Sequence, residues 1–232
     1  MAAPVALSVV IPTLNAAQAL PRCLEALGPA PALRLAEVIV ADGGSTDATR
    51  TVAERSGARV LALGPGRGRG RQLAAGAAVA VGDWLLFLHA DTVPGPGWAE
   101  AAGRFAGDPA NARRAAVFRF ALDDDAPGAR RLEAVVAWRC RALALPFGDQ
   151  GLLISRAFYD ELGGFRPYPV MEDVDLVRRI GRRRLAFLEP VARTSAARYR
   201  AGGYWLRPMR NLACLGLYFL GVPPRLLVRL YG

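Results

Sequence analysis

The chain has 232 residues, of which 53% are hydrophobic and 22% are charged. This predicts one large domain, or one domain with an appendage, and excludes a disordered chain. All 30 basic residues are arginine, and the lack of lysine excludes a Walker A phosphate site and a Schiff-base enzyme. The single histidine, His89, excludes a histidine-rich metal site. The three cysteines lie far apart in the sequence and predict buried free thiols in a reducing compartment: Cys23, Cys140 and Cys214.

The net charge of +10 is concentrated near the C-terminus. Residues 1–177 hold 18 arginines against 19 acidic residues, a net of −1, whereas residues 178–232 hold 12 arginines against Glu189 alone, a net of +11. This excess is either a solvated surface or a face for an anionic partner such as lipid, nucleic acid or a phosphorylated acceptor. The N-terminus lacks the basic region of a signal peptide, and the apolar run 212–222 is shorter than the ~20 residues that cross a bilayer. We therefore expect a cytoplasmic protein that can lie peripherally on the inner face of a membrane.

Short apolar runs alternate with helical patterns in the first half of the chain. We expect strands at 7–12, 37–41, 59–63 and 84–89, and helices at 17–27, 46–56 and 70–81. Ser45 is a candidate N-cap for the second helix. Strands that alternate with helices predict an α/β fold with a doubly wound, mostly parallel sheet and helices on both faces.

The second half is less regular. We expect helices at 97–107, 131–145 and 172–181, and strands at 115–122, 152–155 and 185–188, the second of these before the segment 158–162. The last segment, residues 205–232, is a basic, amphipathic helical tail that Pro223-Pro224 interrupts. Two placements stay open for it: packing against the domain, or lying in a membrane interface.

Polar residues follow each of the first four predicted strands, where ligands bind in sheets of this kind. They are Pro12, Thr13 and Asn15 after the first strand, Asp42 and Ser45 after the second, Arg71 and Gln72 after the third, and Asp91 after the fourth. A carboxylate at a strand end can bind a base or ribose, glycines allow close approach, and a helix N-terminus favours anions. A simple turn with capping residues is the alternative for the segment 42–47.

Two groups of carboxylates are candidates for chemistry. Asp91 ends an apolar strand, where a charge is costly unless it is paired or binds a metal. One carboxylate with diphosphate oxygens would hold Mg²⁺ or Mn²⁺. Glu172, Asp173 and Asp175 open a helix, where acids also favour the dipole, and one of them would have to be the general base.

Taken together, four motifs resemble family two glycosyltransferases with the GT-A fold. The motifs are VVIPTLN at 9–15, ADGGSTD at 41–47, FLHADT at 87–92 and MED at 171–173. GRGRQ at 68–72 and GDQG at 148–151 are similar to a small bacterial subgroup. The resemblance implies inverting transfer of a sugar from a nucleoside diphosphate sugar, usually UDP-linked, to an acceptor hydroxyl, which can be lipid-linked.

The resemblance also implies residue roles. Pro12, Thr13, Asn15, Asp42, Ser45, Arg71 and Gln72 would bind the nucleotide, Asp91 would bind the divalent cation, Mn²⁺ or Mg²⁺, Asp173 with Glu172 would act in catalysis, and Asp149 and Gln150 would meet the donor or acceptor sugar. It divides the chain into a glycosyltransferase domain, 1–204, and the tail, 205–232; the domain has a nucleotide-binding half, 1–95, and an acceptor half, 96–204.

Two other functions compete with this one. A nucleotidyltransferase that makes sugar nucleotides uses a similar sheet, but its glycine-rich, basic signature is absent after the first strand. A non-enzymatic protein could bind nucleic acid or lipid through the basic tail. No basic segment carries interleaved aromatic residues or a recognition-helix pattern, so we expect no nucleic-acid partner.

Overall fold

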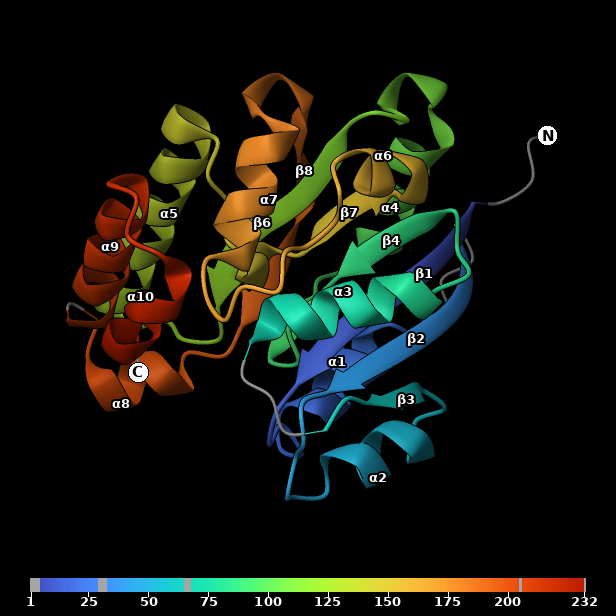
Figure 1. Ribbon diagram of the computed structural model, residues 1–232, viewed down its shortest axis with the longest axis horizontal. Coiled ribbons are helices and arrows are strands. Elements are labelled where there is room, and N and C mark those ends of the chain that lie inside the picture. Colours follow the sequence, from blue (N-terminus) through green and yellow to red (C-terminus); the bar gives the residue numbers. More distant parts are fainter. Residues whose placement is uncertain (1–4, 29–32, 65–67, 205, 232) are drawn as a thin grey trace.

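The computed structural model describes residues 5–28, 33–64, 68–204 and 206–231. Within them, eight strands form one sheet in the order β3-β2-β1-β4-β7-β6-β8-β5 (Figure 1). The strands are β1 (Ala6–Thr13), β2 (Arg34–Asp42), β3 (Arg59–Ala62), β4 (Trp84–Phe87), β5 (Thr92–Pro94), β6 (Ala115–Leu122), β7 (Leu152–Ser155) and β8 (Leu185–Thr194). The α-helices are α1 (Leu20–Ala26), α2 (Thr49–Arg55), α3 (Arg69–Val79), α4 (Trp98–Gly107), α5 (Pro127–Leu143), α6 (Arg156–Glu161), α7 (Glu172–Ile180), α8 (Ala197–Gly202), α9 (Leu206–Phe219) and α10 (Pro224–Tyr231). Three 3₁₀ turns are η1 (Pro109–Asn111), η2 (Gly148–Gln150) and η3 (Arg182–Arg184).

The sheet is parallel in its first half and mixed in its second. Strand β1 pairs in parallel with β2 and β4, and β2 pairs in parallel with β3. The direction changes between β4 and β7, which are antiparallel; β6 runs antiparallel to β7 but parallel to β8. The carboxyl ends of β1, β2 and β3 therefore meet at one edge, beside the point where the sheet changes direction.

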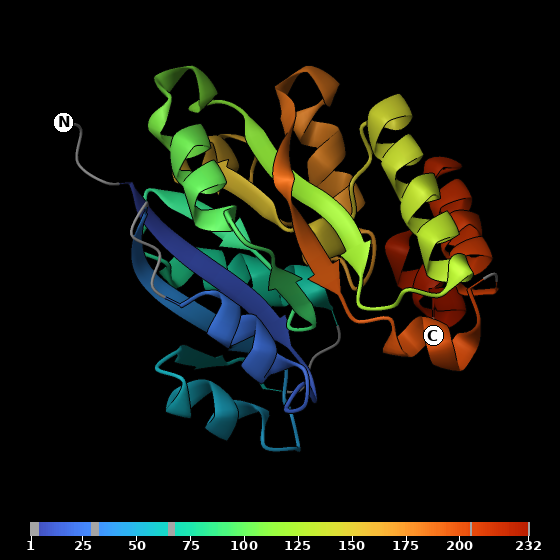
Figure 2. The same ribbon diagram turned by 180° about the vertical axis from the view of Figure 1, so that it is seen from behind.

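Helices cover both faces of the sheet, which confirms the predicted α/β architecture (Figures 1 and 2). On one face, α1 and α4 bury Cys23 and Trp98 in the same cluster as Val9 of β1. On the other face, α3, α6 and α7 bury Leu73, Phe158 and Val177 against the sheet. The alternating side chains of a strand supply the two cores.

Most element bounds differ by a few residues from those expected, and three differences have a clear physical or structural reason. Strand β8 runs to Thr194 instead of ending at 188, because a register shift in its pairing with β6 accommodates Pro190, which has no N–H to donate. The short strand β5 was not predicted; it pairs with β8, so a segment of the predicted first half lies in the second half of the sheet. Ser45 is not the N-cap of α2, which begins at Thr49 after Ala48.

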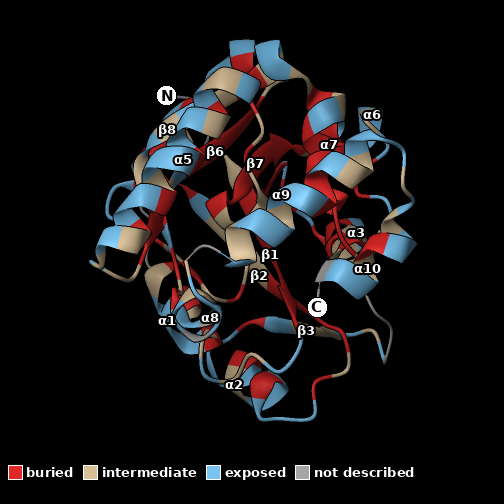
Figure 3. Ribbon diagram, turned by 90° about the vertical axis from the view of Figure 1, so that its left-hand side faces the viewer, coloured by how far each residue is buried: buried red, intermediate tan, exposed pale blue. Residues whose placement is uncertain are grey.

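The C-terminal tail is a hairpin of two helices, α9 and α10, separated at Pro223-Pro224 as predicted. Its inner side packs on the domain, where Cys214, Leu215 and Leu227 are buried in one cluster with Met171 and Val174. Its outer side faces solvent (Figure 3). Among the described residues no helix has the length and apolar character needed to cross a membrane. Trp205, which was expected to begin the tail, lies outside the described residues.

All three cysteines are free and buried, as predicted. Burial, together with the nearby charge of Asp91, raises the pKa of Cys23 to about 12. Its thiol donates to the carbonyl of His89. It is therefore a core residue, which packs below the end of β4.

Candidate active site

The ends of β1 and β2 carry an ordered carboxylate, Asp42, which is 1% exposed. Its Oδ1 accepts from the amides of Gly44 (3.1 Å) and Ser45 (3.0 Å), and its Oδ2 accepts from the Thr13 hydroxyl (3.1 Å) and the Ser45 hydroxyl. The guanidinium of Arg50 lies 3.9 Å away. These hydrogen bonds, from the end of β1 and from the loop after β2, fix the orientation of the carboxylate, so a ligand would meet a preformed acceptor.

Asn15 joins the loop after β1 to the loop after β2. Its backbone has φ 51°, in the left-handed region that asparagine tolerates. Its backbone N–H donates to the Ser45 hydroxyl (2.8 Å), and its side-chain Oδ1 accepts from the backbone N–H of Thr46 (2.9 Å). The hydroxyl of Ser45, expected to cap a helix, is thus spent on linking the two loops.

The first turn of α3 completes this edge. The Gln72 side-chain amide donates to the carbonyls of Thr13 (2.6 Å) and Ala41 (2.9 Å), which ties the ends of β1 and β2 together. The guanidinium of Arg71 donates to the Leu63 carbonyl (2.8 Å). Pro12 is buried within β1, where it lies opposite Ala41. Residues 65–67, which precede α3 and include Arg67, lie outside the described residues.

A second group of carboxylates lies where the sheet changes direction. Burial raises the pKa of Asp149 to about 6, Arg139 opposes that shift, and the charges of Asp173 and Asp91 add to it. Asp149 Oδ1 is buried and has no hydrogen-bond partner. Asp91 and Asp173 therefore both act electrostatically on Asp149, whose Oδ1 is an acceptor that the protein itself does not satisfy.

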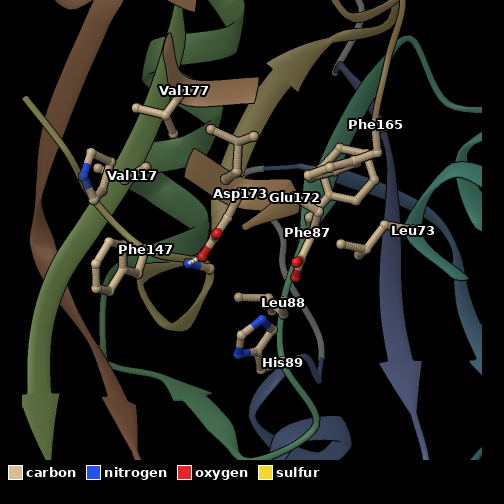
Figure 4. A pocket seen from close by; sticks show the side chains of 14 residues that line it. Leu73, Phe87, Leu88, His89, Val117, Phe147, Phe165, Glu172, Asp173 and Val177 are labelled. Carbon is tan, nitrogen blue, oxygen red and sulfur yellow. Dashed lines mark hydrogen bonds between the residues drawn. The ribbon is translucent and has the colours of Figure 1, made fainter. Parts of the chain in front are cut away.

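Asp173 lies at the N-terminus of α7 (Figure 4), where one backbone amide from η2 and one from α7 hold its carboxylate in place. Its Oδ2 accepts from the Gly148 amide at 2.7 Å, and its Oδ1 accepts from the Val174 amide at 2.8 Å. A Cβ at position 148 would lie 2.6 Å from His89 Nε2. Only glycine leaves room for this amide to approach Asp173 beside the His89 ring.

Glu172 points in a different direction and is 0% exposed. Its Oε1 lies 2.9 Å from Nε of Arg69, at the start of α3. Burial raises the pKa of Glu172 to about 7, although Arg69 opposes the shift. This contact joins α7 to α3 across the face of the sheet. Glu172 is therefore placed to position its neighbour Asp173 rather than to meet solvent.

Two other polar side chains are engaged within the protein. Gln150 is 2% exposed; its amide donates to the Phe118 carbonyl (3.0 Å), and its Oε1 accepts from the Cys140 thiol (3.2 Å). Asp175 binds the guanidinium groups of Arg166 (3.1 Å) and Arg179 (2.5 Å). Of the three acidic residues that open α7, Asp173 is therefore the one best placed for proton transfer.

Arg139 also belongs to this centre, although no sequence pattern marks it. It lies in the interior of α5, with no motif around it, and stacks 3.5 Å above the ring of Phe147. Its Nε and Nη2 atoms are buried without a hydrogen-bond partner. Its position beside Asp149 depends on how α5 packs, which local sequence does not encode.

The family follows from comparison with known proteins. The model of glycosyl transferase family 2 matches residues 8–139, which is more than half of the chain. The chain belongs to glycosyl transferase family 2. The matched segment contains the edge built by Thr13, Asp42 and Gln72, together with Asp91. The resemblance drawn from the four motifs is therefore confirmed.

Curated relatives of this family 2 protein include a PGL/p-HBAD biosynthesis glycosyltransferase of Mycobacterium tuberculosis. The two sequences are 38% identical over 96 residues, which cover 39% of this chain and 37% of the relative. A protein of the same description from Mycobacterium bovis matches equally. The chain thus aligns with less than half the length of these relatives.

Solved structures share the fold. Glucosyl-3-phosphoglycerate synthase from Mycobacterium tuberculosis, crystallised with Mn²⁺, UDP and glucosyl-3-phosphoglycerate, has a TM-score of 0.57 and 24% identity, over 82% of this chain and 70% of that chain. Another structure of that enzyme, with Mn²⁺, UDP-glucose and phosphoglyceric acid, has a TM-score of 0.60 and 22% identity, over 94% and 81%. These likenesses establish the GT-A fold for the family 2 chain.

Proposed function

We propose that this protein is an inverting glycosyltransferase that moves a sugar from a nucleoside diphosphate sugar, with UDP as the favoured nucleotide, to an acceptor hydroxyl. One observation carries the proposal: Asp173 is fixed by the amides of Gly148 and Val174, at the end of the sheet that also carries the ordered Asp42 carboxylate. A base held beside a nucleotide-binding edge has the arrangement that glycosyl transfer requires.

The nucleotide would bind at the edge formed by the ends of β1 and β2. Asp42 would accept hydrogen bonds from the base or ribose, and Asn15 and Ser45 shape the loops on either side. The Thr13 and Gln72 hydrogen bonds hold the edge in place, and Pro12 contributes only through its backbone in β1. Arg71, exposed at the start of α3, would meet the diphosphate.

The transfer step needs one base. The acceptor oxygen attacks the anomeric carbon from the face opposite the diphosphate and forms the new C–O bond. The old bond to the diphosphate oxygen breaks with its electron pair leaving on the diphosphate, and the hydroxyl proton moves to the Asp173 carboxylate. Attack from the opposite face inverts the configuration. Asp149, with its unsatisfied Oδ1, would bind a sugar hydroxyl, and Gln150 shapes the turn that carries it.

A divalent cation, Mn²⁺ or Mg²⁺, fits this site only together with the substrate. Among the described residues no three histidine, cysteine or acidic side chains form a ligand set. Asp91 acts electrostatically on the buried Asp149, so the centre offers carboxylate oxygens, the kind of ligand that Mg²⁺ and Mn²⁺ take, but too few of them to hold a cation alone. Asp91 would hold the cation, and diphosphate oxygens would complete its coordination. When bound, the cation neutralises charge on the leaving diphosphate.

The acceptor is proposed to be a hydroxyl compound presented at a membrane surface, such as a lipid-linked acceptor, with the enzyme lying peripherally on the cytoplasmic side. The support is the C-terminal tail, which is basic and amphipathic and packs against the start of the helix that carries Asp173. An acceptor held at that surface would reach the base without leaving the interface.

A panel of nucleotide sugars with Mn²⁺ or Mg²⁺ tests the function. Thermal stabilisation reports donor binding, and release of the nucleoside diphosphate reports turnover. Asp173→Asn is the matched variant: it should keep the stabilisation by donor and lose ~10²–10⁴-fold in turnover. Release of pyrophosphate from a nucleoside triphosphate and a sugar phosphate would instead identify a nucleotidyltransferase. Turnover of Asp173→Asn close to that of the unmodified protein would remove Asp173 from its role.

A further inference from the structure

The outer side of the C-terminal hairpin is apolar. Five large side chains along α9 and its end are exposed: Leu206 (78%), Met209 (61%), Leu212 (61%), Phe219 (47%) and Leu220 (82%). Their spacing places them on one side of the helix. Helix α10 adds Leu226 (52%) and Leu230 (51%). We call these seven residues the apolar face; such a face marks an interaction site.

The hairpin that carries the apolar face is firmly attached. Cys214, Leu215 and Leu227 are buried against Val170 and Met171 on its inner side. At the margin of the apolar face, the guanidinium of Arg178 on α7 lies 5.0 Å from the centre of the Phe219 ring, so Phe219 is shared between the face and the domain. Because the inner side already has its partners, the outer side is free to contact something else.

Charge identifies the kind of partner. Residues 206–231 contain no aspartate or glutamate and four arginines: Arg207, Arg210, Arg225 and Arg229. On α10 the exposed Arg225 and Arg229 lie next to the exposed leucines. The combination of leucine and arginine on a short helix suits a helix that lies in the headgroup region of a bilayer.

A second copy of the chain is a poorer partner for this face. Two copies related by a twofold axis would place the same patch against itself. The arginines would then face arginines, and no acidic residue follows Glu189 to neutralise them. An anionic headgroup layer supplies the missing negative charge and an apolar layer beneath it.

We propose that the apolar face docks on an anionic lipid bilayer, with α9 and α10 lying parallel to its surface. The docking itself does not depend on the proposed glycosyl transfer. Its consequence for the acceptor does: Met171, buried under the hairpin, lies two residues before Asp173. The bilayer would therefore hold a lipid-borne hydroxyl close to the base.

Vesicle sedimentation with the full chain tests the docking. We expect binding to vesicles of phosphatidylcholine with phosphatidylglycerol, and little binding to phosphatidylcholine alone. The double variant Leu206→Gln/Leu220→Gln should bind at least tenfold more weakly. Arg225→Gln/Arg229→Gln should lose about 30-fold, at about fivefold for each arginine. The matched control is Val81→Gln, which changes a comparably exposed apolar residue (72%) between the end of α3 and the start of β4 and should bind normally.

Three results would overturn the proposal. The first is equal binding of the unmodified chain to both kinds of vesicle, and the second is unchanged binding of Leu206→Gln/Leu220→Gln. The third is a dimer in light scattering that this variant dissociates, without vesicle binding by the unmodified chain; the face would then hold a second copy. Nucleotide release measured without vesicles reports on glycosyl transfer separately, so failure of one proposal is distinguishable from failure of the other.

Discussion

Gly148→Ala should slow the reaction without abolishing the fold. The glycine amide donates to Asp173 Oδ2 at 2.7 Å, and the space beside it is taken by His89. A new Cβ would lie 2.6 Å from His89 Nε2 and 3.5 Å from Asp173 Oδ2. Since non-bonded heavy atoms prefer separations of about 3.5 Å, the turn or the His89 ring has to move by about 1 Å.

The size of the effect follows from that displacement. A catalytic group moved by about 1 Å can lose about 10²-fold in rate, and an extra methyl group in a packed site costs about 1–3 kcal/mol of stability. We therefore expect kcat to fall about 100-fold. The KM for the donor should stay within a few-fold, because the Asp42 edge does not contact Gly148.

Release of nucleoside diphosphate at saturating donor and acceptor measures kcat, and thermal unfolding checks that the variant is folded. Gly107→Ala is the matched control, because a Cβ there meets nothing within 4 Å; it should behave like the unmodified chain. A folded Gly148→Ala protein with kcat within threefold of normal would refute the idea that this amide sets the position of Asp173.

Three further changes test other parts of the site. Asp91→Ala should leave only the turnover that the unmodified protein retains in EDTA, and metal-stimulated turnover in this variant would exclude Asp91 as the ligand. The Asp42 carboxylate accepts four hydrogen bonds, and in Asp42→Asn one of its oxygens becomes an NH₂ group that cannot accept them. The dissociation constant of the nucleotide sugar in thermal-shift titrations should therefore rise at least tenfold. Unchanged affinity would place the nucleotide elsewhere. Burial raises the pKa of Glu172 to about 7, so the native state holds a proton that the unfolded chain releases from about pH 4.5 upward. That stabilisation is complete at low pH and lost as the pH rises through 7. As the pH rises from 5 to 7.5, the free energy of unfolding measured in urea should therefore fall by on the order of 3 kcal/mol more for the unmodified chain than for Glu172→Gln. Parallel curves for the two proteins would contradict a buried, proton-binding Glu172.

The sequence predicted elements whose signal is local. The bounds of β6 and β7 agree with the expected 115–122 and 152–155, because each is an apolar run between turns. Strand β5 escaped prediction because its three residues form a strand only by pairing with β8, about a hundred residues later. The sequence predicted an end of β8 at 188 because Pro190 follows, and proline usually ends a strand. In the structure Pro190 lies at a register shift, and the strand continues to Thr194.

The same distinction applies to the candidate site. Thr13, Asp42 and Asp91 could be selected because parallel strands bring their carboxyl ends to one edge. Local sequence gave no information on the pairing of Glu172 with Arg69 or on the place of Arg139 beside Asp149. Those contacts join helices that are far apart in the chain, so they depend on tertiary packing.

The side chain of Gln72 has a consequence for how tightly a donor can bind. Its side-chain amide donates to the carbonyls of Thr13 and Ala41, near the ends of two neighbouring strands. A Cβ at Gly43 would lie 2.7 Å from the same Nε2 atom, so there is no room for a side chain there. The proposed nucleotide-binding edge is thus assembled before any ligand arrives, and little conformational entropy would be lost on binding. Differences in affinity among nucleotide sugars should then reflect their direct contacts with the protein, because each of them would meet the same preformed edge.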